Sequence, residues 1–399
     1  MDKNDYLKLF LIATVLALAY GIWYSYSVFL VAFDETFNWS RSTLAAGFSI
    51  FALVHGVTNP VSSALCDRIN SGILVVAGGF CISISLLLVS FIKTPFDLFL
   101  FFGVFTAISV SMCGWGPSLV QVQRSFKHNL GFAIGFVSSG IGVGMVIAVP
   151  LIQLCIDTFG WRNCFRILSV ITFVVIIPIG LFLTKNFVAG LSSQSLDNKN
   201  PKTSSLNLSQ AFKTGQFWLL VSLYFFGSMG AQTLHVHQVV YLVEKGISPI
   251  VGASVVSVVG LSSIFGKLAG GYLSDKVERE KVFIAGNIIL IAGIFILYFA
   301  GEKASVPLAY IFAICLGIGY SSTAAIAPAI ISDHFGGRHF GKILGIGLFG
   351  GASGAAVGPF VAGELFDNFG NYKLAFIFAV VSILIALSCC TVVRLNKNK

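Results

Sequence analysis

The amino-acid sequence predicts an all-α integral membrane protein in which twelve transmembrane helices form two pseudo-symmetric six-helix bundles. Three observations predict this class: a low content of charge, a series of long apolar windows, and an internal repeat. Of the 399 residues, 56% are hydrophobic and only 10% are charged, and the mean hydropathy is +0.90. Because average soluble domains carry about 25% charged residues, this composition argues against a water-soluble enzyme.

Twelve windows of low charge recur along the chain, each close to the length of about 20 residues that a helix needs to cross a bilayer core. Unpaired backbone groups are costly in hydrocarbon, so each window is expected to be a helix. The first is too long for a cleaved signal peptide, and no small-residue cleavage site follows it. The expected spans are residues 8–32, 43–66, 73–92, 97–121, 131–156, 164–184, 216–243, 250–273, 282–300, 307–332, 343–366 and 372–393.

One connection is long and polar. Residues 185–215 are rich in Ser, Asn and Lys, which predicts a linker between an N-terminal bundle, residues 1–184, and a C-terminal bundle, residues 216–399. With both termini inside, seventeen Lys and Arg fall on inner segments and seven on outer ones, so we expect cytoplasmic termini and a cytoplasmic linker. We also expect a plasma-membrane location, the inner membrane of a bacterium. These bases are scattered, so the net charge of +9 does not indicate nucleic-acid binding.

The two halves repeat each other at an offset of roughly 210 residues. Parallel repeats of six helices build a large class of secondary transporters, with the substrate site at the midplane between the halves. The repeated glycines also have the small-x3-small spacing of close helix packing in lipid. The matching features are Asp67-Arg68 with Asp275-Lys276, Gly131-x8-Gly140-x3-Gly144 with Gly345-x8-Gly354-x3-Gly358, and Asp157-x2-Gly160 with Asp367-x2-Gly370.

The segment from Gly266 to Lys276 resembles the signature loop of the major facilitator superfamily, and residues 62–68 form a degenerate first-half counterpart. The resemblance covers essentially the whole chain and implies the fold of that superfamily. Within it, the sequence is similar to the monocarboxylate-transporter-like branch and the bacterial oxalate–formate exchangers. The matching motifs are Gly21-x-Trp23, Phe37-Asn38-Trp39-Ser40-Arg41, Ala133-x-Gly135-x4-Gly140-x-Gly142, Gly160-Trp161-Arg162 and Phe335-Gly336-Gly337-Arg338-His339-Phe340-Gly341.

The resemblance implies that a cation in the eighth span binds the substrate carboxylate, and Lys267 stands at that position. This sequence departs from the pattern of the branch at three positions that concern proton coupling. Ser263 replaces the branch's partner carboxylate, Tyr20 replaces an acidic residue, and the lysine that some members carry in the first span has no counterpart. Lys also lacks the planar fork with which Arg grips a carboxylate. The resemblance therefore implies anion recognition more than any particular scheme of proton coupling.

Lys267 is the main candidate for binding the solute. It lies eight residues before Asp275, about 12 Å of helix rise. A charge at membrane depth costs about 2.5–3.5 kcal/mol on insertion scales and is functional by default. The alternatives are that its ammonium snorkels to the membrane surface or contacts a backbone carbonyl.

Three further side chains are candidates for carrying a proton: His55, His235 and Glu364. His55 and His235 titrate near neutrality when unperturbed, although each could instead be a neutral, hydrogen-bonded packing residue. On the seventh span Gln232 shares a face with His235, whereas His237 points away from it. Glu364, near the outer end of the eleventh span, is most simply an interfacial carboxylate.

Aromatic and polar side chains of spans one, four and seven are expected to shape the cavity. Tyr20, Trp23 and Tyr24 share one stripe of the first helix, with packing as the alternative role. The substrate-binding set is Lys267, Tyr20, Trp23, Tyr24, Gln121, Gln232 and His235. The Asp-then-base pairs Asp67, Arg68, Asp275 and Lys276 are expected to gate the inner side, unless the bases are merely topogenic.

The sequence thus predicts a secondary active transporter that moves a small organic anion, with a monocarboxylate favoured, by proton-coupled alternating access. The alternatives are an exporter of a neutral solute or drug, and an anion exchanger. No catalytic or phosphate-loop motif is present, and the eight cysteines lack metal-ligand spacing, so no enzyme, cofactor or metal site is expected. The expected partners are the anion, a proton or counter-anion, and membrane lipid, around a monomer without nucleic acid.

Overall fold

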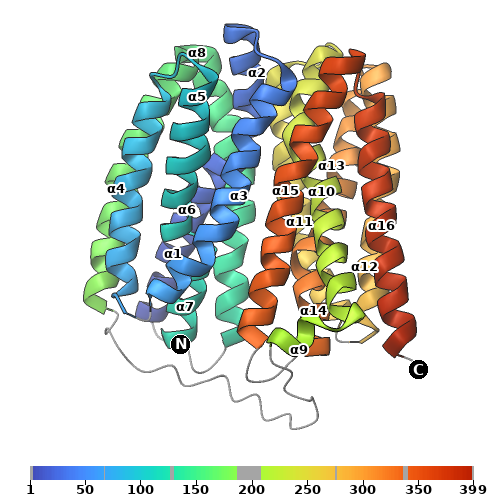
Figure 1. Ribbon diagram of the computed structural model, residues 1–399. Coiled ribbons are helices and arrows are strands. Elements are labelled where there is room, and N and C mark those ends of the chain that lie inside the picture. The colour runs from blue at the N-terminus through green and yellow to red at the C-terminus, as the bar shows by residue number, and fades with distance from the viewer. Residues whose placement is uncertain are drawn as a thin grey trace. The chain divides into compact units, whose positions relative to one another are not determined.

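The computed structural model describes residues 3–66, 68–125, 130–186, 208–274, 276–335 and 340–397, and within them the regular structure is entirely helical (Figure 1). The first half contains α1 (Lys3–Tyr24), α2 (Tyr26–Phe37), α3 (Arg41–Leu65), α4 (Ser71–Val89), α5 (Pro95–Leu98), the π-helical segment η1 (Phe99–Thr106), α6 (Ala107–Cys113), α7 (Trp115–Ser125) and α8 (Leu130–Asn186). The second half contains α9 (Leu208–Phe212), α10 (Gly215–Glu244), α11 (Pro249–Ser274), α12 (Arg279–Glu302), α13 (Val306–Ser321), the π-helical segment η2 (Ser322–Ile326), α14 (Ala327–Phe335), α15 (Phe340–Phe369) and α16 (Lys373–Lys397).

Within the described residues, eleven helical stretches are long and apolar enough to cross a membrane. One of them, residues 133–185, contains Gly160, whose φ of 75° and ψ of 155° are not helical. Glycine tolerates such a positive φ because it lacks a Cβ. The bend at Gly160 therefore joins the predicted fifth and sixth spans without a separate loop, and the twelve-helix membrane fold is confirmed.

The fourth and tenth spans are not the uninterrupted α-helices that the sequence suggested. The fourth runs through α5, η1 and α6, breaks at Gly114 (φ −87°, ψ −154°), and continues as α7. The tenth runs through α13, η2 and α14. In η1, Thr106 Oγ1 donates to the carbonyl of Phe101. π-Helical segments inside α-helices are frequent at functional sites.

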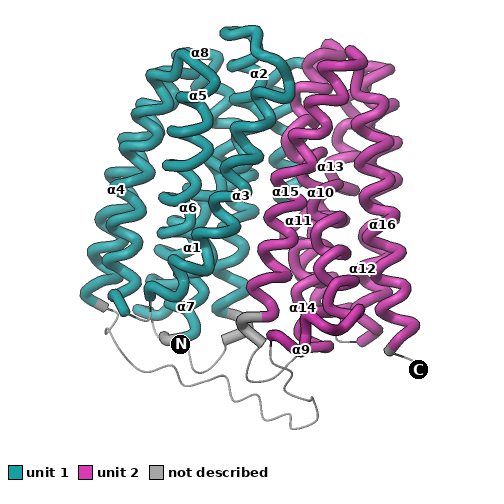
Figure 2. The backbone as a smooth tube through the Cα atoms, in the orientation of Figure 1, with its two compact units in different colours: residues 1–193, 248–261 teal, residues 194–247, 262–399 magenta. Residues whose placement is uncertain are grey.

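Contacts divide the chain into two compact units, which Figure 2 colours separately. Unit 1 comprises residues 1–193 and 248–261, and unit 2 comprises residues 194–247 and 262–399. The first part of α11 therefore belongs to unit 1, whereas its second part, which carries Lys267, belongs to unit 2.

The repeated glycines make equivalent helix contacts in the two units. In unit 1 α8 packs against α1, and in unit 2 α15 packs against α10. At four of the repeated glycines, two in each unit, a Cβ would collide with a backbone carbonyl of the facing helix. The facing pairs are Gly140 with Ala13, Gly144 with Ala17, Gly354 with Phe225, and Gly358 with Met229. The small-x3-small pattern thus marks backbone-to-backbone packing of matching helices.

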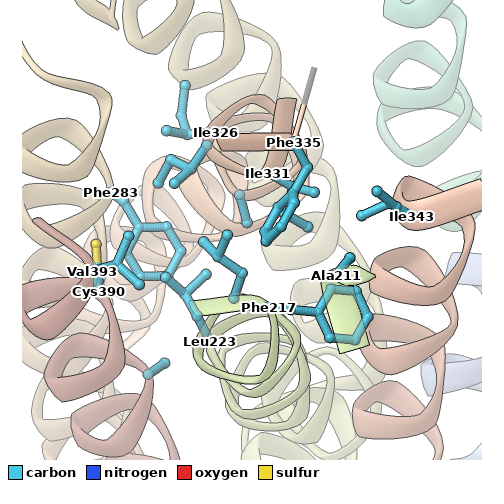
Figure 3. Packing of buried hydrophobic residues seen from close by; sticks show 14 residues of the cluster. Ala211, Phe217, Leu223, Phe283, Ile326, Ile331, Phe335, Ile343, Cys390 and Val393 are labelled. Carbon is cyan, nitrogen blue, oxygen red and sulfur yellow. The ribbon is translucent and has the colours of Figure 1, made fainter. Parts of the chain in front are cut away.

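A cluster of buried apolar side chains packs between helices of unit 2 (Figure 3). Phe217 of α10, Phe283 of α12 and Ile331 of α14 are nearly inaccessible within it. Ala211 of the short helix α9 belongs to the same cluster. Part of the segment expected to be a polar linker is therefore helical and anchored to the core.

Two of the motifs that carry the family resemblance meet in unit 1. The rings of Phe37 and Trp39 stack with centroids 4.2 Å apart. Trp161 donates from Nε1 to Thr36 Oγ1 at 3.0 Å, and the Arg162 guanidinium lies 4.2 Å from the Trp161 ring centroid. These residues fasten the end of α2 to the bend of α8, so their role is structural.

Candidate functional site

Lys267 is positioned by a close crossing of α11 and α13 in unit 2. The space around Gly266 is filled by Ser321 and by the backbone of Ile318, so the two helices approach closely there. Ser321 Oγ donates to the carbonyl of Ser263 at 3.0 Å. This crossing sets Lys267, the residue after Gly266, beside Tyr320, the residue before Ser321.

The Lys267 side chain is half-buried, and its Nζ lies 6.0 Å from the centroid of the Tyr320 ring. Among the residues that the structure describes, no carboxylate forms an ion pair with this ammonium. An aromatic face attracts a cation weakly and does not cancel its charge. The ammonium is therefore electrostatically unbalanced within the described part of unit 2.

His235 of α10 also contacts Tyr320. Its imidazole is 4% exposed, and its centroid is 4.8 Å from that of Tyr320, with the rings nearly perpendicular. Gln232, one turn earlier, is also buried, and its Oε1 has no hydrogen-bond partner among the described residues. Tyr320 thus brings together two residues that the sequence singled out, Lys267 and His235.

His237 faces a different part of unit 2, as expected from its helical position. Its Nε2 lies 2.9 Å from the carbonyl oxygen of Pro359, and its Nδ1 lies 3.0 Å from Tyr372 Oη. A carbonyl only accepts, so Nε2 carries a hydrogen and donates to Pro359. The imidazole of His237 therefore links α10 to α15 and to Tyr372, the residue before α16.

In unit 1 the aromatic stripe of α1 meets His55 of α3. The rings of Trp23 and His55 are 4.8 Å apart at 88°, and those of Trp23 and Phe51 are 4.8 Å apart at 90°. Tyr20 stacks on Trp23 at 5.6 Å. Trp23 Nε1 and His55 Nε2 are buried without a hydrogen-bond partner in the described residues. Buried N–H groups normally have hydrogen-bond partners, so these two ring nitrogens can form further hydrogen bonds.

The remaining candidates lie as follows. Tyr24 is buried beside Trp23, with ring centroids 6.2 Å apart. Gln121 is fully buried on α7, and neither atom of its amide has a partner among the described residues. Glu364 is exposed on α15, and the described residues contribute no ion pair to its carboxylate. Neither Gln121 nor Glu364 is hydrogen-bonded into the two clusters above.

The structure describes only two of the four residues predicted to form the gate, Arg68 and Lys276. Asp67 and Asp275 lie outside the described residues. Arg68 is exposed just beyond α3, and Lys276 Nζ lies 4.2 Å from the centroid of the Tyr272 ring. The pairing of each aspartate with its neighbouring base remains a prediction.

Sequence reasoning missed two features of unit 2. The first is Tyr320, and the sequence signal that could have revealed it is the polar run from Tyr320 to Thr323 in an otherwise apolar span. The second feature is an ion-pair cluster: Glu278 contacts Arg394 Nε at 2.5 Å and Lys281 Nζ at 3.1 Å. The hydrogen bond from Arg394, followed by that from Lys281, holds the pKa of Glu278 below its ordinary value.

The described residues contain no group of three His, Cys, Asp or Glu side chains that could hold a metal ion. They do place Lys267, His55, His235, Gln121 and Gln232 inside membrane-spanning helices. Polar and ionisable groups at that depth mark transport pathways by default. The fold and these buried groups together define a polytopic membrane transport protein.

Comparison with known proteins identifies the family. The model of the Major Facilitator Superfamily matches residues 12–269 and 238–399, and the chain belongs to this superfamily of transporters. It is similar to monocarboxylate transporter 12 of Homo sapiens, with 24% identity over 93% of this chain and 77% of the relative. It is also similar to monocarboxylate transporter 13 of Rattus norvegicus, with 24% identity over 91% of this chain and 82% of the relative.

A solved structure shows the same fold. The crystal structure of a bacterial homologue of the human lysosomal transporter Spinster, in an inward-facing and unoccupied conformation, superposes with a TM-score of 0.77. The alignment covers 98% of this chain and 97% of that one at 16% sequence identity. At this identity the similarity establishes the architecture alone.

Proposed function

We propose that this superfamily member is a secondary active transporter that moves a small organic anion, with a monocarboxylate favoured, by alternating access coupled to protons. The observation that carries the proposal is the Lys267 ammonium, which lies in a membrane-spanning helix beside Tyr320 with no ion-pair partner among the described residues. A bound carboxylate would cancel this charge. The names of the monocarboxylate transporters to which the chain is similar support the same solute class.

The physical reason is the cost of an uncompensated charge in a medium of low dielectric constant, which a charge-assisted hydrogen bond to a carboxylate removes. The ring of Tyr320 supplies an apolar surface next to the ammonium. An organic anion with a short carbon skeleton suits a site with one cationic group and one aromatic face. A cationic solute has no matching carboxylate in this cluster.

The proposal assigns the remaining residues as follows. Tyr20, Trp23, Tyr24, Gln121, Gln232 and His235 contact the solute together with Lys267. His55, His235 and Glu364 are the candidate proton carriers, and the pairs Asp67–Arg68 and Asp275–Lys276 gate the inner side. The protein acts as a monomer in a bacterial inner membrane, with both termini in the cytoplasm.

Transport by the Lys267→Ala variant tests the proposal. In proteoliposomes, uptake of radiolabelled pyruvate should fall to the protein-free background in this variant, because Lys267 supplies the charge that binds the carboxylate. Lys303, exposed at the end of α12, provides a matched control, and Lys303→Ala should transport normally. Unchanged uptake by Lys267→Ala would remove Lys267 from the mechanism.

An anion exchanger is the second candidate. It is favoured by Ser263, which stands where the resemblance implies a carboxylate that takes part in coupling. An exchanger would take up labelled pyruvate only into vesicles that contain a counter-anion, whatever the pH gradient. Thermal stabilisation of the purified protein by neutral solutes but not by carboxylates would instead favour an exporter of neutral compounds.

A further inference from the structure

Lys267 and His235 approach Tyr320 from two helices of the same unit. The ammonium lies 6.0 Å, and the imidazole centroid 4.8 Å, from the Tyr320 centroid, so the two groups are at most about 11 Å apart. His235 is 4% exposed, so water screens this interaction poorly. A positive charge on Lys267 therefore acts directly on the protonation of His235.

This placement links two binding events. While Lys267 carries an uncancelled charge, a second positive charge on His235 is disfavoured, because like charges repel strongly in a medium of low dielectric constant. An anion bound to Lys267 cancels the first charge and adds a negative group near the imidazole. By thermodynamic linkage, binding of the anion must then strengthen proton binding, and proton binding must strengthen anion binding.

We propose that His235 takes up the co-transported proton when an organic anion binds at Lys267. This inference rests on the proposed function and assigns the coupling to one of its candidate groups. The balance is simple: the empty site carries the charge of Lys267, and the loaded site carries Lys267, the carboxylate and a protonated His235. Both states have the same net charge.

No other described titratable group competes for this role at the cluster. Tyr224 of α10 interacts with Tyr320, and both are phenols that stay neutral at physiological pH. The remaining titratable groups on the helices around α10 have their own contacts or are exposed. They include His237 with Pro359 and Tyr372, Tyr241 with Tyr298, Lys245 with Glu302, Arg279 with Asp333, Lys281 and Arg394 with Glu278, His334 with Ile330, Glu280 near Cys390, and the exposed Glu364, Asp367 and Lys373.

Equal charge in both states has a measurable consequence. A carrier that crosses with the same charge, loaded or empty, completes a cycle that moves one anion and one proton. Net uptake is then electroneutral. It should respond to a pH gradient and be indifferent to a membrane potential. Without a proton on His235, the loaded site is neutral, and a full cycle moves one negative charge.

Pyruvate transport by the full-length protein in proteoliposomes tests the inference, with His235→Gln as the variant and His334→Gln as the matched control. Uptake by the wild type and the control should rise when the interior is alkaline and stay constant when a potassium diffusion potential is imposed. His235→Gln should bind pyruvate more weakly, as the linkage requires, lose the stimulation by the pH gradient and respond to the potential. Titration calorimetry in buffers of different ionisation enthalpy should show proton uptake on pyruvate binding in the wild type and none in His235→Gln.

The possible failures are distinguishable. Undiminished stimulation by the pH gradient in a His235→Gln protein that binds pyruvate would overturn the assignment of His235 and leave the proposed function intact. Proton uptake on pyruvate binding that persists in a His235→Gln protein with an unchanged melting temperature would likewise overturn the proton role of His235. Absence of binding by the wild type to pyruvate, lactate and acetate would overturn the proposed function itself.

Discussion

Gly354 of α15 lies directly against the backbone carbonyl of Phe225 on α10, where no side chain fits. One turn further along, Gly358 lies in the same way against Met229. In unit 1, Gly140 repeats this contact on α1. The contact is made by backbone atoms on one side, and these cannot rotate aside as a flexible side chain would.

Gly354→Ala should therefore destabilise the protein although alanine favours helix. Overpacking of a tight contact typically costs about 1–3 kcal/mol, which should lower the melting temperature by several degrees in detergent. Gly345→Ala on the same helix is the control, because a Cβ there meets no atom within 4 Å. That variant should melt at or above the wild-type temperature. Equal melting temperatures for the two variants would contradict the packing.

His237→Leu should also destabilise unit 2. The substitution leaves the Pro359 carbonyl and the Tyr372 hydroxyl without the imidazole that bonds both, and each buried group left unpaired costs about 1–3 kcal/mol. Thermal unfolding followed by circular dichroism gives the measurement, with His334→Leu as the comparison. A melting temperature equal to that of the wild type would show that the two hydrogen bonds contribute nothing.

His55→Leu should have the opposite effect on stability. His55 Nε2 is buried beside Trp23 without a hydrogen bond in the described structure, and replacing an unsatisfied polar group with an apolar one of similar size is neutral or stabilising. Stabilisation together with loss of pyruvate uptake would mark His55 as a residue kept for function. A fall in melting temperature would instead show that the imidazole stabilises the fold.

Glu278 gives the protein a pH dependence outside the membrane-spanning segments. Hydrogen bonds from Arg394 and Lys281 lower its pKa in the folded state, so its contribution to stability is present above the ordinary glutamate pKa of about 4.3. This contribution is lost as the pH falls through the lower, folded-state pKa.

The difference in melting temperature between the wild type and Glu278→Gln should therefore be largest near neutral pH and vanish in acid. Glu364→Gln, at an exposed carboxylate, provides the comparison for stability. A difference that persists below the folded-state pKa, or that grows in acid, would show that Glu278 acts through packing rather than through its charge.

The sequence was sufficient for the membrane spans and for the repeat, because long apolar windows and glycine spacing are local signals. The pairing of Gly354 with Phe225 could be anticipated only as close packing, since spacing says nothing about which helix faces it. The interruptions at η1, η2 and Gly114 were missed, because a π-helical turn has the same apolar composition as an α-helical one.

The candidate site was predicted unevenly for similar reasons. Lys267 and His235 were found because a charge or an imidazole in an apolar window is conspicuous. Tyr320, which contacts both, was not found, because an aromatic residue in a membrane helix is usually interpreted as a packing residue. The different environments of His235 and His237 followed from helical geometry alone.

A single residue, Gly160, turns the chain between two membrane crossings of unit 1. Because no loop separates these two helices, lengthening one of them or rotating it about its axis must also move the other. Trp161 and Arg162 anchor the turn to its neighbours immediately afterwards. A peptide tag inserted at this point would thus shift the register of both crossings at once, whereas the same tag at a true loop would leave them in place.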